Sequence, residues 1–207
     1  AEDADTQQYY FVDCGDHDPA TLSAGDSFGS LNSVTDQLYG KDPESGYSWG
    51  VLMDEENGEM ETPGEGSYVS SPDDKAVYTN YQKALSNTQS DLEDGKNKAD
   101  TFRYAHNQGE SGIDPRYVAY KFELDPGVYS VNVGMSNTWG NASNPTVTLS
   151  AEGTEDVSEV YNISGGRQDK TLAADLTDAE VNENGRVELT VKATSSDATI
   201  QMTYITI

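Results

Sequence analysis

The sequence of 207 residues is poor in cysteine and histidine, with one Cys and two His. A single cysteine excludes a disulfide within the chain and a cysteine-based metal centre, and two histidines leave little material for a histidine triad or a zinc site. No apolar run approaches the length of about 20 residues that a membrane helix needs, so we expect no membrane insertion. Cys14 ends the apolar run Tyr9–Cys14, which predicts a buried free thiol rather than a nucleophile.

The chain is also poor in positive charge, with 12 Lys and Arg against 37 Asp and Glu and a formal net charge of −25. A surface of this sign repels nucleic acid and anionic membranes, so we expect neither as a partner. It also repels polyanionic polysaccharides, unless a local Arg or Lys cluster or bound cations reverse the field at the site.

The hydrophobic content of 34% suits one sizeable domain in a chain of this length. Residues 1–8 are polar and we interpret them as a linker end, followed by a single domain over 9–207. Residues 16–68 are rich in turn-forming and acidic residues and predict a long loop insertion, which is uncommon unless it is functional or held by an ion. The composition suggests a secreted or cell-surface bacterial protein, and we expect a monomer.

The clearest pattern lies between Arg116 and Trp139. Apolar and polar residues alternate over 118–124 and again over 129–135, which predicts two half-buried strands. Asp125-Pro126-Gly127 between them has turn chemistry, with Gly127 free to take a positive φ, so we expect an antiparallel hairpin. This hairpin would lead into a polar loop that carries Trp139.

Further short strands are predicted along the rest of the chain. They cover residues 9–14, 51–53, 101–104, 146–151, 158–163, 170–176, 186–193 and 198–207, and turn residues separate them. Residues 74–92 favour a short helix, with a short strand as the alternative. The pattern as a whole predicts an all-β jelly-roll sandwich of two antiparallel sheets with long loops and one short helix.

Exposed aromatic residues beside polar ones suggest a sugar-binding site, because an aromatic ring packs on the C–H face of a pyranose. For Trp49 and Trp139 the alternative is a place in the core. Arg103, Asp114 and Arg116 flank the predicted hairpin, and they offer either hydrogen bonds to a ligand or a structural Arg–Asp pair. The predicted ligand-binding residues are Trp139, Asn137, Tyr104, Arg103, Arg116, Asp114, Trp49, Asp36 and Tyr39.

Acidic residues crowd the segment after the first predicted strand. Asp13, Asp16, Asp18 and Asp42 are candidate ligands of a structural Ca²⁺, which prefers hard oxygen donors. Their spacing matches no EF-hand loop, and a solvated acidic surface is the alternative.

Several motifs resemble malectin-like carbohydrate-binding modules. YVAYKFELDPGVYSVNVGMSNTW (117–139) resembles the core motif of that family, YYFVDCGD (9–16) its start and GRVELTVKATSSDATIQMTYITI (185–207) its end. The segment 28–51 is similar to one found in secreted multimodular glycosidases of bifidobacterial and clostridial type. The resemblance implies a jelly roll whose loops at one end bind sugar, often with a structural calcium.

Together these patterns favour a non-catalytic module that binds an oligo- or polysaccharide and targets a covalently linked glycoside hydrolase to its glycan. Two alternatives remain. One is a structural or adhesive spacer of a cell-surface protein, and the other is a small jelly-roll polysaccharide lyase or hydrolase, for which the spacing of the acidic residues selects no catalytic pair.

Overall fold

The computed structural model describes residues 9–14, 37, 39–52, 80–83, 101–105, 116–137, 142–164, 166–195 and 200–207. For residues 13, 80–83, 101–105, 116, 166 and 167 only the backbone is described.

The described chain forms two antiparallel sheets of six strands each. In sheet A the order is β10 (Gly166–Asp175), β7 (Val128–Asn137), β12 (Ile200–Thr206), β5 (Thr101–Ala105) and β4 (Asn80–Lys83), and β1 (Phe11–Asp13) also pairs with β12. In sheet B the order is β2 (Gly40–Lys41), β3 (Ser48–Val51), β6 (Arg116–Leu124), β11 (Val187–Ser195), β8 (Thr146–Ser150) and β9 (Val157–Val160). This arrangement confirms the predicted all-β jelly-roll sandwich.

The strands β6 and β7 follow each other in sequence but do not pair with each other. β6 pairs with β3 and β11 in sheet B, and β7 pairs with β10 and β12 in sheet A. The expected hairpin is therefore wrong: residues 125–127 carry the chain from one sheet to the other. Each strand has one apolar face, and the two faces pack across the core instead of joining edge to edge. Gly127 is outside the left-handed region, so the turn makes no use of a positive φ there.

Strand β12 lies at the centre of sheet A and departs from simple alternation. Its register with β7 shifts between Met202 and Tyr204, so two residues of β12 face one of β7. This bulge interrupts the alternation of inward and outward residues along β12. Ile205 belongs to the core cluster instead of Tyr204. Tyr204 packs over Gly134, where a Cβ atom would lie 2.3 Å from the tyrosine ring.

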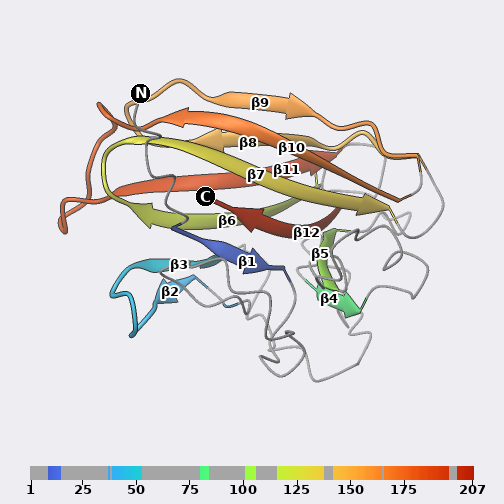
Figure 1. Ribbon diagram of the computed structural model, residues 1–207, viewed down its shortest axis with the longest axis horizontal. Coiled ribbons are helices and arrows are strands. Elements are labelled where there is room, and N and C mark those ends of the chain that lie inside the picture. The colour runs from blue at the N-terminus through green and yellow to red at the C-terminus, as the bar shows by residue number, and fades with distance from the viewer. Residues whose placement is uncertain are drawn as a thin grey trace, which may run out of the picture.

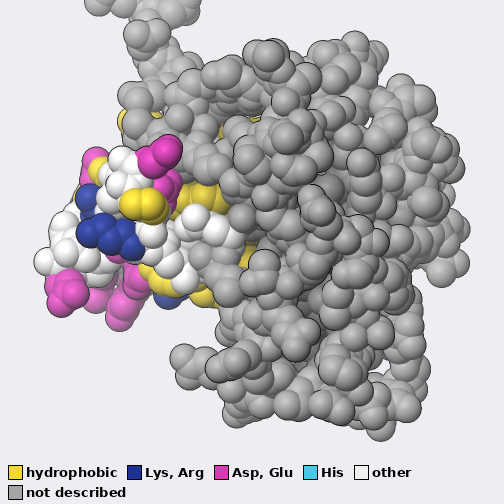
Figure 2. Space-filling model, turned by 90° about the horizontal axis from the view of Figure 1, so that it is seen from below, with side chains coloured by type: hydrophobic (Ala, Val, Ile, Leu, Met, Phe, Trp, Pro, Cys, Tyr) yellow, Lys and Arg dark blue, Asp and Glu magenta, His cyan; other side chains and the backbone are white. Residues whose placement is uncertain are grey.

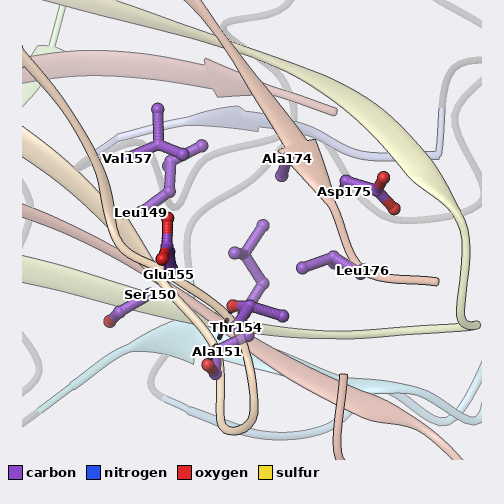
Figure 3. Close-up of a pocket in the computed structure, with 10 residues that line it drawn as sticks. Leu149, Ser150, Ala151, Thr154, Glu155, Val157, Ala174, Asp175 and Leu176 are labelled. Carbon is purple, nitrogen blue, oxygen red and sulfur yellow. Dashed lines mark hydrogen bonds between the residues drawn. The ribbon is translucent and has the colours of Figure 1, made fainter. Parts of the chain in front are cut away.

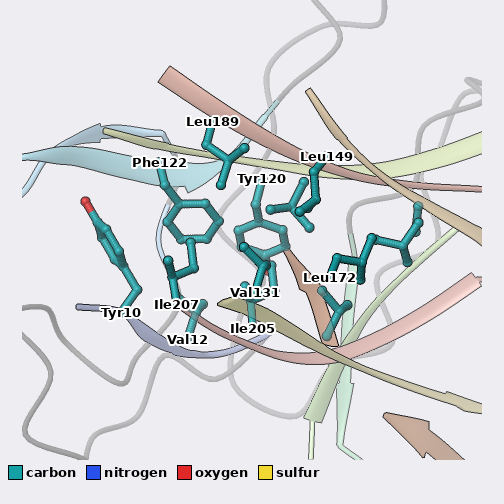
Figure 4. Packing of buried hydrophobic residues seen from close by; sticks show 14 of the residues in the cluster. Tyr10, Val12, Tyr120, Phe122, Val131, Leu149, Leu172, Leu189, Ile205 and Ile207 are labelled. Carbon is teal, nitrogen blue, oxygen red and sulfur yellow. The ribbon is translucent and has the colours of Figure 1, made fainter. Parts of the chain in front are cut away.

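The core fills the space between the two sheets (Figure 4). Tyr120, Phe122 and Leu189 from sheet B face Val131 and Ile205 from sheet A. Full burial of such side chains contributes roughly 1.5–3 kcal/mol each. The free thiol of Cys14 is buried with them, as predicted.

Two local predictions need correction. Residues 80–83, within the stretch expected to favour a helix, form strand β4, and the described residues contain no helix. The strand expected at 51–53 lies earlier, at Ser48–Val51, where it pairs with β2 and β6. Among the described residues, no helix has the length and apolar character needed to cross a membrane.

Candidate functional site

The strand ends define two ends of the sandwich, which lie at the right and the left of Figure 1. At the right, β7 ends at Asn137 and β10 begins opposite it. Ile200 at the start of β12 pairs with Ala105 at the end of β5, and Arg116 at the start of β6 pairs with Ser195 at the end of β11. These four strand ends lie on the same side. We call this the Asn137 end. The opposite side carries the turn 125–127 and is called the Glu123 end.

Several of the predicted ligand-binding residues occupy the Asn137 end. Asn137 is the last residue of β7 and is buried, Arg116 is the first residue of β6, and Arg103 and Tyr104 lie in the last three residues of β5. Residues far apart in sequence are therefore neighbours in the fold. Trp139, Asp114 and Asp36 lie outside the described residues.

Other predicted residues lie elsewhere. Trp49 is opposite Phe122, six residues along β6 from Arg116, and six residues of strand span about 20 Å. Its side chain is fully buried, stacks on Phe122 with centroids 6.5 Å apart and donates from Nε1 to Oδ2 of Asp42 at 3.4 Å. Trp49 therefore packs in the core, and neither face of its ring is accessible to a sugar.

Tyr39 also lies away from the Asn137 end, where it joins a polar group on the outer face of sheet B. Its hydroxyl donates to Oε1 of Glu188 at 2.8 Å, and Lys121 Nζ lies 5.3 Å from the centre of its ring. Burial raises the pKa of Tyr39, and the bond to Glu188 adds to the shift. The side chain has structural partners on both its ring and its hydroxyl.

Buried polar residues concentrate at the Asn137 end. Eight polar or charged residues of the described part are buried: Asp42, Glu123, Ser136, Asn137, Ser143, Ser195, Gln201 and Thr203. All but Asp42 and Glu123 lie near this end, and those six are uncharged. Ser136 Oγ donates to Gln201 Oε1 at 3.1 Å. Buried polar groups need hydrogen-bond partners, so such a cluster is costly unless each of its members is satisfied.

The sequence gives little sign of this cluster. Ser136 and Gln201 stand at positions that simple alternation assigns to an exposed sheet face. Their burial depends on the surrounding chain, which local sequence patterns do not show.

At the Glu123 end lies an ion pair whose carboxylate is buried. The carboxylate of Glu123 accepts hydrogen bonds from Ser48 N and Asn182 Nδ2, each at 2.8 Å, and pairs with Arg186 Nη1 at 3.3 Å. Burial alone raises the pKa of Glu123, but the hydrogen bonds from Ser48, Asn182 and Arg186 outweigh it, so the net pKa is lowered. A carboxylate held ionised in this way suits a structural role and not that of a general acid.

Arg186 connects this ion pair to the edge of sheet B. Its guanidinium lies 3.6 Å from the centre of the Tyr47 ring, and Nη1 donates to the carbonyl of Gly46 at 2.6 Å. Tyr47 in turn donates to the carboxylate of Asp125 at 3.2 Å. Figure 2 shows acidic and basic side chains close together on the left of the molecule, on the same side as β2 and β3 in Figure 1.

A small cavity lies between the β8–β9 turn and the end of β10 (Figure 3). Leu149, Ala174 and Leu176 line its apolar part, and Glu155 and Asp175 are among its polar lining residues. Its volume of about 20 Å³ has room for roughly one water molecule. The cavity is too small for a sugar ring.

Asp42 is the one predicted calcium ligand whose side chain the structure describes. Its Oδ1 accepts from Glu44 N at 2.8 Å, its Oδ2 accepts from the Trp49 indole, and the residue is buried. Both oxygens have protein partners, so Asp42 is poorly suited to hold a cation. The described residues contain no group of three or more metal-ligating side chains. The structure describes only the backbone of Asp13, and Asp16 and Asp18 lie outside its described residues.

No protein-family model matches the sequence, and no curated protein matches it. Among solved structures, the chain is similar to a family 61 carbohydrate-binding module in complex with β-1,4-galactotriose, at 17% identity and a TM-score of 0.37, over 65% of this chain and 83% of that one.

Two further structures resemble the chain. One holds the CBM22-1 and GH10 modules of Clostridium thermocellum xylanase 10B with xylohexaose, at 13% identity and a TM-score of 0.36 over 60% of this chain. The other is the enzymatically active domain of tailspike protein 4 of bacteriophage CBA120, at 8% identity and a TM-score of 0.37 over 60% of this chain. This chain spans 23% and 17% of their lengths. Likeness at this level assigns no family and no ligand.

Proposed function

We propose that this protein binds carbohydrate without catalysis, at the Asn137 end of the sandwich. The observation that carries the proposal is the gathering of Arg103, Tyr104, Arg116 and Asn137 at one end of the fold, beside the cluster of buried uncharged polar residues. Aromatic, guanidinium and amide groups together are what a pyranose requires, because its ring stacks and its hydroxyls need donors and acceptors.

The strand that leads to this end is long and is paired along both of its edges. β7 runs for ten residues between β10 and β12, and it ends two residues before Trp139. We expect a Kd of roughly 10⁻³ to 10⁻⁵ M for a single site, because water satisfies sugar hydroxyls nearly as well as protein does.

The wider setting follows from the resemblance to malectin-like modules. We propose a secreted or cell-surface protein in which this domain targets a linked glycoside hydrolase, with avidity offsetting the weak single site. A structural calcium at Asp13, Asp16 and Asp18 is part of the same proposal, without Asp42.

The first test is a glycan array on the purified protein, with and without EDTA, followed by calorimetry on each hit. We expect binding to a defined sugar without product release. Loss of binding in EDTA would support the calcium proposal. A blank array with folded protein would favour a structural spacer, and release of product from a polysaccharide would favour a lyase or hydrolase.

The position of the site is tested with a pair of aromatic substitutions. We expect Trp139→Ala to weaken binding at least tenfold, because stacking on an aromatic ring is lost. Tyr39→Ala, at a distance from the Asn137 end, serves as the matched control and should bind as the unmodified protein does. Thermal unfolding checks that both variants fold. Equal loss in the two variants would contradict a site at the Asn137 end.

A further inference from the structure

Strand β10 is the last strand of sheet A in the described part of the chain, where it pairs with β7. It runs for ten residues from Gly166 to Asp175, and its register with β7 has no bulge. Its sequence contains no proline. A long, regular edge strand invites pairing with a further strand, and short length, bulges and proline are common features that prevent it. β10 has none of these three features, and an inward-pointing charge is a further one.

Lys170 is a charged residue at an inward position of this strand. It is opposite Val133, and the next inward residue along β10, Leu172, is opposite Val131. Leu172 and both valines belong to the core. Residues opposite each other in an antiparallel pair share a face of the sheet. Lys170 therefore continues a row of core residues, at a position where alternation predicts an apolar side chain.

The ammonium of Lys170 lies at the seam between β10 and β9, which run side by side near the top of Figure 1. Nζ is 3.2 Å from Oε2 of Glu159 in β9 and 5.7 Å from the centre of the Tyr161 ring. Gln168, the preceding inward residue, accepts a hydrogen bond from Asn162 N at 2.8 Å. The side chain of Lys170 is 30% exposed and that of Glu159 is 48% exposed, so water reaches the ion pair. A long lysine side chain can follow an apolar surface in this way while its charge stays hydrated.

We propose that Lys170 keeps β10 from pairing with β10 of a second copy of this protein. A strand added to β10 would extend sheet A past the seam and enclose the pair of Lys170 and Glu159. Enclosure is unfavourable, because the desolvation of an ion pair commonly outweighs the attraction within it. Against a second copy the charge acts twice, since two identical edges meet about a twofold axis and each contributes its own lysine.

The position of Lys170 near the middle of β10 determines how close the two lysines would come. When the inner faces stay on one side, two antiparallel registers leave all but one residue of β10 paired. One register places the two lysines directly opposite each other, with Cβ atoms about 5 Å apart. The other places each Lys170 opposite Leu172 of the second copy, with the lysines on a diagonal of about 7–8 Å. Both registers therefore bring like charges together.

The test removes this charge and measures self-association. We expect Lys170→Val to form a dimer with an association constant at least tenfold above that of the parent protein, measured by sedimentation equilibrium. The measurements use about 0.5 M NaCl, because salt screens the repulsion between two chains of net charge −25. Valine suits a strand and fits the row of core residues. Amide hydrogen exchange in β10 should slow as the concentration of this variant rises.

Lys121→Val is the matched control. Lys121 also pairs with a glutamate, Glu188, at 3.6 Å, and its side chain is 27% exposed. Its strand β6, however, has a neighbouring strand on each edge. This variant should associate no more than the parent protein. Lys170→Arg keeps the charge and Glu159→Gln keeps the lysine, so both should also behave as the parent protein does.

Three results would overturn the proposal. One is equal association of Lys170→Val and Lys121→Val, and another is a parent protein that already dimerises through β10. The third is open-ended aggregation of folded Lys170→Val, because a twofold contact between two β10 edges closes at the dimer. If Lys170→Val fails to fold, Lys170→Thr replaces it with another uncharged residue that suits a strand, and the same outcomes apply. This inference is independent of the proposed carbohydrate binding.

Discussion

At the scale of single residues, Glu123 shows how one charge can connect segments distant in sequence. Its carboxylate accepts hydrogen bonds from Ser48, Asn182 and Arg186. Its backbone carbonyl accepts a hydrogen bond from the hydroxyl of Tyr10 at 2.6 Å. Burial raises the pKa of Tyr10, with the charge of Glu123 adding to the shift. The neutral phenol is thereby kept as a donor.

We predict that Glu123→Gln lowers the free energy of unfolding by about 1–3 kcal/mol at pH 7, because hydrogen bonds to a buried charge are weakened. Glu159→Gln is the matched control: Glu159 pairs with Lys170 at 3.2 Å and its side chain is 48% exposed, so its loss should cost less than about 1 kcal/mol. Urea unfolding measures both. Equal effects would contradict a special role for Glu123.

The same pair of variants gives a prediction for pH. The pKa of Glu123 is lowered in the folded protein from an ordinary value of 4.5, so its ionised form contributes stability above about pH 4.5. That contribution is lost as the pH falls through the folded pKa. The difference in unfolding free energy between the parent protein and Glu123→Gln should therefore be constant near neutral pH and shrink below pH 4.5. A difference that grows in acid would contradict the lowered pKa.

At the scale of elements, the edge formed by β2 and β3 depends on contacts from outside its own strands. β3 is a short strand of four residues, and only three of them pair with β6. β2 has two residues. Gly46 turns the chain between them with a φ of 75°. Arg186, from the loop before β11, stacks on Tyr47 and binds the Gly46 carbonyl. Arg186 is therefore one of the side chains that hold this edge in place, together with Tyr39, which donates to Glu188, and Trp49, which packs on Phe122.

We predict that Arg186→Ala raises amide hydrogen exchange at Asp42 and Gly46 about tenfold or more, because local opening of this edge becomes easier. Both amides donate within the turn, at 2.9 and 2.8 Å. Amides at the centre of β7 should exchange as before. Lys170→Ala, at an exposed pair on the opposite edge, is the control. A uniform rise over the whole protein would indicate global destabilisation and not release of this edge.

The connection between β6 and β7 shows what strand patterns predict at this scale and what they do not. Alternation located both strands, at Arg116–Leu124 and Val128–Asn137. It did not show that they belong to different sheets, because alternation identifies the apolar face of a strand and says nothing about its edges. The sequence pattern also did not predict the bulge in β12. One extra residue there exchanges the inward and outward positions that alternation assigns to the rest of the strand.

At the scale of the whole molecule, the net charge of −25 opposes folding. Repulsion between like charges is stronger in the compact state than in the unfolded chain, and salt screens it over about 10 Å at 0.1 M. We predict that the Tm rises by several degrees between 0.05 and 1 M NaCl, measured by calorimetry. Because sodium sulfate also strengthens hydrophobic burial, chloride is the cleaner probe. A Tm that is unchanged or falls with NaCl would contradict net repulsion.

The sequence alone was sufficient for the all-β class, for most strand positions and for the buried thiol, because period-two alternation and turn residues are local signals. It also singled out Arg103, Tyr104, Arg116 and Asn137 as candidates. Only the tertiary structure decided which candidates share an end of the molecule. It moved Trp49 and Tyr39 away from that end and revealed the buried polar cluster around Ser136 and Gln201. Strand pairing joins residues more than 60 positions apart. Which strands pair depends on how the two whole sheets pack, and local sequence patterns carry no information about that packing.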